Sequence, residues 1–390
     1  MIFKSSHPGS PDVSVVISGA TVDYTTISSL TIDVHENMHD MATITFSGFV
    51  PVGITDYVGA PVFISIKVAA ERTIDFYGYI SFIEPKMETR KGLINNSPVQ
   101  TAVATCMGSS YDMVYPKYKT WENITLVQLV SQIAETYGYS YAVPNDTFVW
   151  KRLAQTGTSD WELLTSACKS IGYNVTASGT HIHVYDPYKA VPRQLPYVEL
   201  LTVRGAYGDL KYAPGRIMEF NGLFGNTTLE GNVYNYNYVG IDSSGTVVRS
   251  STEDADFTGF GELAARKGVA EVSTNVTSLE MLNKLSKAST KHNYPYNATA
   301  LVTGVPDPVP GSVVKVDNFN SNFDGYWLVR GARHTVTRSN YVTELTIATD
   351  STTGKNIESK PGAAFNPPPP PVLNKDNVWV SSLDFGDVYA

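Results

Sequence analysis

Residues 62–68 read Val-Phe-Ile-Ser-Ile-Lys-Val, with a β-branched apolar side chain at every second position. Successive side chains of a β-strand point to opposite faces, so this period of two is typical of a strand with one buried face. The same period recurs on both sides of the stretch, at residues 13–17, 30–34, 44–46 and 76–83, with turn residues between the segments. Residues 12 to about 106 therefore predict a small β-barrel or sandwich.

The composition of the chain agrees with a fold dominated by strands. Its 390 residues include 24 Tyr and 15 Phe, and only 17% of the residues are charged. Aromatic and β-branched residues favour half-buried strands, whereas long helices usually carry more charge. The length predicts two or three domains, at a prior of about 150 residues per domain.

The period changes to a helical one between about residues 120 and 186. Apolar side chains recur at helical spacing from Leu126 to Tyr137, Thr125 and Gln128 have the spacing of a capping box, and Gly138 stands where a helix commonly ends. Ser159, Glu162 and Gly172 mark a second helix in the same way.

These two helices belong to an internal repeat. Residues 128–139 align with residues 162–173, each copy reading as helix, glycine, tyrosine and strand. A solenoid needs about three repeats, so one duplication predicts a compact α+β unit instead. Residues 174–177 and 181–185 predict a hairpin that closes this unit.

A second β region follows from about residue 199 to 350, interrupted by a helical stretch near 259–290, where Thr277 and Glu280 form a capping box. After it, five consecutive prolines at 367–371 predict a semi-rigid polyproline spacer. The last residues, 374–390, carry aromatic side chains among aspartates and predict a tethered peptide that orders on a partner. Its candidate partner-binding residues are Trp379, Phe385 and Tyr389.

Charge and cysteine content exclude several classes of protein. A net charge of −8 and a pI near 5.4 argue against a broad basic surface for nucleic acid. Cys106 and Cys168 are too few for a disulfide scaffold and have no zinc-type spacing. No apolar run reaches the length of a signal peptide or of a membrane span, so we expect a protein made in the cytoplasm.

The sequence contains few candidates for catalysis or metal binding. His181 and His183 would share one face of a strand, but no third ligand is suitably spaced, and we expect both on the wet face of the hairpin. Cys168 falls on the apolar face of its helix, and residues 253–256 predict a solvated acidic loop. No nucleotide-binding, hydrolase or metalloprotease motif occurs, so we expect no enzyme, no cofactor and no metal site.

Two segments resemble a known family. Residues 155–173, closing on 181–187, resemble the middle domain of phage tail baseplate hub proteins. Residues 304–314, with 323–329, His334 and 341–345, resemble the last barrel of the same family, which includes the late control protein D group and the hub half of type VI secretion spike proteins. Neither segment is a catalytic signature.

The resemblance implies a mainly β fold with an α+β insertion, in which two tail-tube-like β-barrel domains are joined by a small α+β domain. The expected parts are a first barrel at 1–108, an α+β domain at 109–195, a second barrel with a helical insertion at 196–350, and a proline-rich linker with a docking peptide at 351–390. Three copies of such a chain would present six similar barrels.

The implied function is that of a structural hub in the virion tail, a homotrimer that adapts a hexameric tail tube to a three-fold tip and lines an axial channel for DNA passage. The implied partners are a tail tube or distal tail protein and a tip, spike or fibre protein. Two alternatives remain: the base of a type VI or related injection-system spike, and a carbohydrate-binding or cell-wall-degrading tail tip protein.

Overall fold

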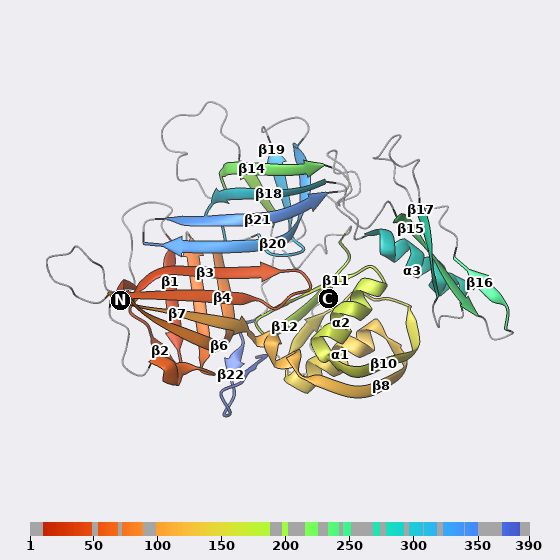
Figure 1. Cartoon of the computed structure of the whole chain (residues 1–390), viewed down its shortest axis with the longest axis horizontal. Helices are drawn as coiled ribbons and strands as arrows, with labels where there is room; N and C mark the ends of the chain where they lie inside the picture. The colour runs from red at the N-terminus through yellow and green to blue at the C-terminus, as the bar shows by residue number, and fades with distance from the viewer. Residues whose placement is uncertain are drawn as a thin grey trace.

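The computed structural model describes residues 11–48, 54–68, 72–88, 99–187, 197–201, 215–224, 233–241, 245–250, 268–273, 278–291, 296–306, 308–317, 323–338, 340–349 and 369–382. Figure 1 shows a large β assembly on one side, an α+β unit beside it, and a smaller strand-and-helix group beyond the α+β unit.

The N-terminal β region forms where the sequence alternates. Residues 62–68 lie in a strand whose side chains at 62, 64 and 66 are fully buried. The strands of this region are β1 (Asp12–Ile17), β2 (Ala20–Thr21), β3 (Ile27–His35), β4 (Met41–Gly48), β5 (Pro61–Val68), β6 (Arg72–Glu88) and β7 (Val99–Gly108). Short 3-10 turns occur at Tyr24–Thr26, Ile54–Tyr57 and Ser109–Val114.

The long strand β6 changes partner along its length. It pairs with β5 from Arg72 to Tyr79 and with β7 from Gly78 to Glu88, so Gly78 lies where the two pairings overlap. A Cβ atom at Gly78 would lie 2.1 Å from the carbonyl oxygen of Met107. Only glycine allows β7 to approach β6 this closely.

The second β region contains β13 (Tyr197–Leu201), β14 (Ile217–Phe224), β18 (Tyr296–Thr303), β19 (Val313–Asp317), β20 (Gly325–Thr337) and β21 (Tyr341–Thr349). Strand β20 pairs antiparallel with β3 of the first region, with Leu30 opposite Val336. At the other end of this joint Gly331 faces His35, whose ring leaves no room for a Cβ atom.

This joint makes one sheet of 13 strands from the two β regions. Its main path runs β14-β18-β21-β20-β3-β4-β7-β6-β5-β1-β2, with β19 pairing β20 and β13 pairing β19. The described strands do not close into a barrel, which differs from the two separate barrels that the resemblance implies. One apolar cluster includes Ile32 and Ile64 from the first region and Trp327 and Ile347 from the second, so the two regions share a core.

The α+β unit consists of β8 (Pro116–Thr125), α1 (Leu126–Tyr137), β9 (Ser140–Ala142), β10 (Val149–Ser159), α2 (Asp160–Ser170), β11 (Asn174–Ser178) and β12 (His181–Tyr185). The internal repeat appears as two copies of strand, helix and strand: β8 pairs with β10, and β9 and β11 flank β12. Both predicted capping boxes are present, at Thr125 with Gln128 and at Ser159 with Glu162.

An insertion within the second β region packs on the α+β unit. It comprises β15 (Val233–Ile241), β16 (Val247–Arg249), β17 (Gly268–Ser273) and α3 (Leu279–Lys291), at the far right in Figure 1. Leu285 and Met281 of α3 join the apolar core of the α+β unit. The prediction of a helical stretch near 259–290 is wrong at residues 268–273, which form a strand that pairs in parallel with β15. Its capping residue Thr277 lies outside the described residues.

Candidate docking groove

The C-terminal part of the described chain is a small hairpin, β22 (Val372–Leu373) and β23 (Trp379–Val380). The side-chain oxygen of Asn374 accepts hydrogen bonds from the backbone N–H groups of Asp376 and Val378, at 2.9 and 3.0 Å. Asn377 adopts the left-handed conformation, with φ +59°, that closes the turn. Local hydrogen bonds thus define the shape of the hairpin.

Trp379 anchors this hairpin to the first β region. Its indole Nε1 donates to the carbonyl oxygen of Gly78 at 3.0 Å, and its backbone N–H donates to the hydroxyl of Tyr79 at 2.9 Å. The ring meets that of Tyr77 edge-to-face, with centroids 5.2 Å apart, and is 8% exposed. Burial of a large aromatic ring with its N–H satisfied is a strong anchor.

The other side of the hairpin contacts the α+β unit. The N–H of Ser381 donates to the carbonyl oxygen of Gly138 at 2.8 Å, and Val380 covers that glycine. Pro371 lies against Gly179 in the turn between β11 and β12. Figure 1 shows β22 beside β6, next to the α+β unit. We call the surface formed by Tyr77, Gly78, Tyr79, Gly138 and Gly179 the hairpin groove.

Of the three residues predicted to bind a partner, the structure places Trp379 against its own chain, whereas Phe385 and Tyr389 lie outside the described residues. The groove residues were not anticipated from the sequence. Tyr77 and Tyr79 lie in a strand whose alternation signals only a sheet, and Gly138 already has a sufficient explanation as a helix-ending residue.

A second contact site joins three parts of the chain through Glu36, in the turn between β3 and β4. Its buried carboxylate accepts hydrogen bonds from Asn174 at 2.7 Å and Tyr185 at 3.0 Å, both in the α+β unit. Arg330 of β20 pairs with the other carboxylate oxygen at 2.6 Å. The neighbouring Asn37 extends this contact by bonding both backbone groups of Val175.

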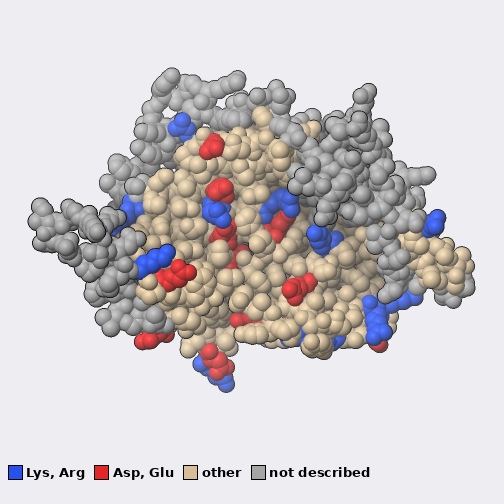
Figure 2. Space-filling view, viewed as in Figure 1, with Lys and Arg blue, Asp and Glu red and all other residues tan. Residues whose placement is uncertain are grey.

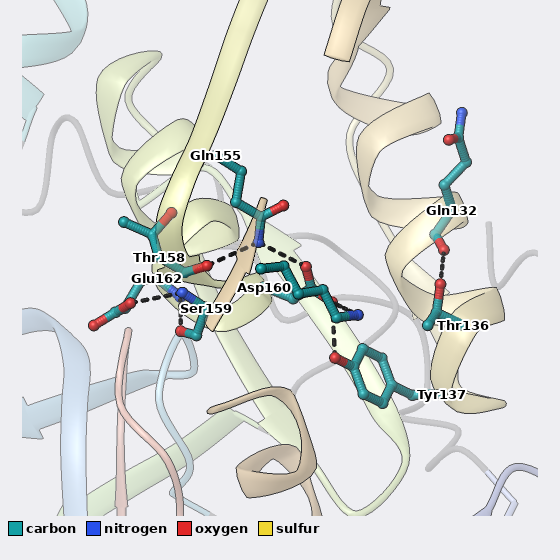
Figure 3. Close-up of polar contacts among 9 residues, drawn as sticks. Gln132, Thr136, Tyr137, Gln155, Thr158, Ser159, Asp160 and Glu162 are labelled. Atoms are coloured by element: carbon teal, nitrogen blue, oxygen red, sulfur yellow. Dashed lines mark hydrogen bonds and ion pairs between the residues drawn. The ribbon is translucent and has the colours of Figure 1, made fainter. Parts of the chain in front are cut away.

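Two buried aspartates stabilise the α+β unit. Asp160 accepts hydrogen bonds from Lys117 at 2.5 Å, Gln155 at 2.9 Å and Tyr137 at 2.7 Å; Figure 3 shows Gln155 and Tyr137 converging on this carboxylate beside the Ser159 capping box. Burial alone would raise the pKa of Asp160, but these hydrogen bonds and the Lys117 charge outweigh it and hold the pKa below the ordinary value.

Asp146 has the same kind of surroundings at the contact with the insertion. It pairs with Lys284 of α3 and accepts hydrogen bonds from the Tyr173 hydroxyl and from the N–H of Phe148. Its pKa is lowered because these partners outweigh the effect of burial. Both aspartates serve packing, because their oxygens are occupied by protein donors.

The expectation that His181 and His183 lie on a wet face of the hairpin is wrong. His183 is buried and stacks on Tyr185, and His181 contacts the Ser140 hydroxyl at 2.9 Å. Burial lowers the pKa of His181 to about 4. The reason is the position of β12, which is the central strand of its sheet and whose residues from Ile182 to Tyr185 are all buried.

Other side chains that could take part in chemistry are also enclosed. His39 lies 3.0 Å from the Ser110 hydroxyl, but Ser110 is only 1% exposed, so a substrate could not reach it. Cys106 and Cys168 are buried, and burial raises the pKa of the Cys106 thiol to about 12. Within the described ranges, no group of three His, Cys, Asp or Glu residues is placed to hold a metal ion.

Charged side chains are interspersed on the described part of the face in Figure 2, with acidic and basic groups adjoining one another near its centre. Ion pairs also join the two β regions, Arg333 with Asp33 and Arg330 with Glu36. None of the helices described is both long and apolar enough to cross a membrane.

Several solved structures share this fold. The 43 kDa tail protein of prophage MuSo2 from Shewanella oneidensis aligns with a TM-score of 0.63 at 13% identity, over 87% of this chain and 99% of that chain. The tail protein from Neisseria meningitidis MC58 aligns with a TM-score of 0.61 at 14% identity, over 89% and 99%.

A component of the type VI secretion system of Escherichia coli, described as structurally similar to bacteriophage T4 tail proteins gp27 and gp5, aligns with a TM-score of 0.50 at 12% identity, over 95% of this chain and 80% of that chain. No protein-family model and no curated protein matches the chain. At these identities the likeness is one of fold, and this chain has the fold that phage tail proteins share with a type VI secretion component.

Proposed function

We propose that this chain is a structural hub of a phage-type tail baseplate. The observation that carries the proposal is the shared fold with two tail proteins over 99% of their lengths. The enclosed histidines, cysteines and aspartates described above support a structural role over an enzymatic one. The protein would accordingly be located in the virion tail.

A homotrimer follows from the symmetry of the proposed role. Each chain contributes two β regions, which we take to correspond to two tube-like units, so three chains supply six units around an axis. Such a ring adapts a hexameric tail tube on one side to a three-fold tip on the other. It also encloses an axial channel, and the net charge of −8 favours DNA passage over DNA binding.

One edge strand of the sheet could join neighbouring copies by strand pairing. Among the described strands, β14 pairs only with β18 and therefore ends one side of the sheet. On this strand Met218 and Leu223 are 48% and 59% exposed. An edge strand with exposed apolar side chains is a surface for association. We propose that β14 pairs with the next copy in the ring.

Native mass spectrometry of the purified protein, with electron microscopy of tails carrying a labelled copy, tests the hub. We expect a trimer of the 42.5 kDa chain, located where the tail tube meets the tip. A monomer at all concentrations, together with absence of the label from tails, would contradict the proposal.

A second candidate function is the base of an injection-system spike, which the likeness to the Escherichia coli type VI component favours. The tail proteins align with higher TM-scores, 0.63 and 0.61 against 0.50, so the phage tail takes precedence. Co-purification with a tail tube from lysed infected cells, as opposed to a secretion apparatus, distinguishes the two.

Phe385 and Tyr389 follow the hairpin among acidic residues, and we propose that they contact a neighbouring tail component. Changing both to alanine should leave the trimer mass unaltered and weaken co-purification of that component.

A further inference from the structure

The hairpin groove presents polar groups that match a tryptophan. The Gly78 carbonyl oxygen receives the indole N–H, and the Tyr79 hydroxyl receives the backbone N–H of the same residue. A phenylalanine would fill the space but leave the Gly78 carbonyl without this donor.

The groove also spans two parts of the fold. Tyr77, Gly78 and Tyr79 belong to the sheet, whereas Gly138 and Gly179 belong to the α+β unit. Both of the latter glycines have positive φ, and a Cβ at either one would crowd Val380 or Pro371. An occupant of this groove therefore holds the α+β unit against β6.

The occupant is an independent piece of structure. The contacts of Asn374 define its turn from within, and the prolines at 367–371 that precede it have no backbone N–H to join a strand ladder. The contacts of Trp379, Val380 and Pro371 described above hold it to the groove. A segment held this way can leave and return without unfolding the sheet.

We propose that residues 371–381 are a releasable latch, which docks through Trp379 into the hairpin groove of its own chain and adds to the Glu36 contacts in fixing the orientation of the α+β unit relative to the sheet. This proposal goes beyond the hub function and does not depend on it. The groove recognises a β-hairpin that presents a tryptophan, and the occupant is the chain's own C-terminal hairpin.

Hydrogen exchange of the full-length protein, read by mass spectrometry, tests the docking. In Trp379→Ala the amides of residues 378–382 should exchange at least about tenfold faster, because the docked state is lost. Trp379→Phe should have an intermediate effect, and Val372→Ala, an exposed position of the same hairpin, should have none. Unchanged exchange in Trp379→Ala would overturn the latch.

Addition of a synthetic peptide of residues 369–382 tests the groove itself. It should bind full-length Trp379→Ala and bind the unaltered protein at least about tenfold more weakly, since the tethered hairpin competes at high effective concentration. The same peptide with alanine for tryptophan should bind neither. No binding to Trp379→Ala would contradict the proposal. Should that variant not fold, Ser381→Pro removes the donor to Gly138 and replaces it in both experiments.

Cross-linking of mixed light and heavy isotopic copies tests whose groove is filled. Lys375 is exposed in the turn of the hairpin, and its cross-links should join residues of one isotopic form. Cross-links from Lys375 between light and heavy chains would show that the hairpin enters a neighbouring copy, which would overturn the own-chain assignment. Neither result tests the proposed hub function. That function is tested separately, by the mass of the assembly and by its location in the tail.

Discussion

At the scale of the residue, Glu36 joins three parts of the chain through one side chain. One carboxylate serves Asn174 and Tyr185 in the α+β unit and Arg330 in the second β region. Removing it takes an acceptor away from three donors, two of them on buried side chains. Buried donors that lose their partner cost more than the hydrogen bond itself had contributed.

We therefore expect Glu36→Ala to lower the free energy of unfolding by about 3 kcal/mol, in the range for a broken buried ion pair. Urea unfolding followed by circular dichroism measures this. Glu84→Ala is the matched control, because Glu84 and Lys86 are each more than half exposed and 3.9 Å apart. It should change stability by less than about 0.5 kcal/mol. Equal effects of the two substitutions would show that Glu36 is not a junction.

The pKa of Asp160 predicts a pH dependence. The folded-state pKa lies below the ordinary value of 3.8, so the folded chain binds fewer protons than the unfolded chain in that window. The stabilisation is present above pH 4 or so and is lost as the pH falls through the folded-state pKa. Asp160→Asn should flatten this acid limb in urea unfolding series.

Glu122→Gln, a change at an exposed position of β8 in the same unit, is the control and should leave the acid limb as it is. An acid limb of unchanged slope in Asp160→Asn would mean that other carboxyls, Asp146 among them, account for the whole effect.

Contacts between residues close in sequence could be predicted, and contacts between distant residues could not. Thr125 with Gln128 and Ser159 with Glu162 follow from a spacing of three along one helix end. The docked position of Trp379 depends on Gly78, which lies 301 positions away in the sequence, and no local pattern specifies that pair. The aromatic residues among aspartates near the C-terminus identified Trp379 as a contact residue. They did not indicate that its contact lies within the same chain.

At the scale of the element, the duplicated strand, helix and strand of the α+β unit explains its sequence repeat. Each copy begins its helix with a capping box and continues past a glycine of positive φ, Gly138 or Gly172, into a strand of the same sheet. Local propensity and tertiary pairing agree here, which is why the sequence was informative.

The capping boxes predict two separate losses of stability. Thr125→Ala and Ser159→Ala should each lower the free energy of unfolding by about 1 kcal/mol, because each leaves helix N–H groups without an acceptor. Thermal unfolding of the single and double variants measures this. Ser166→Ala, on the exposed side of α2, is the control and should not lower the free energy of unfolding, because alanine favours a helix more than serine does. A neutral result for either cap would show that neighbouring contacts replace it.

The expected helix at 259–290 illustrates where local reasoning fails. Residues 268–273 include alanine and glutamate, which favour helices, yet they form β17 in parallel with β15. The partner strand lies some 35 residues earlier, and its pairing overrides the local preference. The later part, α3, kept its helical pattern because one face packs on the α+β unit through Leu285.

At the scale of the whole molecule, the continuous sheet determines how a ring of copies could close. The sheet joins two β regions that the sequence indicated as separate, because alternation shows that a strand exists but not which edge it pairs with. Within one chain β3 and β20 supply the joint, and β14 ends the sheet.

Charge placed on the β14 edge should therefore prevent assembly. The double variant Met218→Lys, Leu223→Lys should remain folded, because both side chains are exposed, and should convert the trimer into monomer in native mass spectrometry. Ile241→Lys with Val247→Lys is the control, since these residues are 58% and 57% exposed on the insertion. A trimer that survives in the first variant would exclude β14 from the interface.

The β3–β20 joint also has a consequence for the order in which the chain folds during translation. Leu30 pairs with Val336, roughly 300 residues later, and ribosomes add about 5–20 residues per second, so β3 waits about 15 to 60 seconds for its partner. The nascent N-terminal region therefore carries a bare strand edge until synthesis is nearly finished. Chains released before residue 325 would lack β20 and expose this edge permanently, and they should aggregate. Only chains translated past this strand can cover the edge of β3.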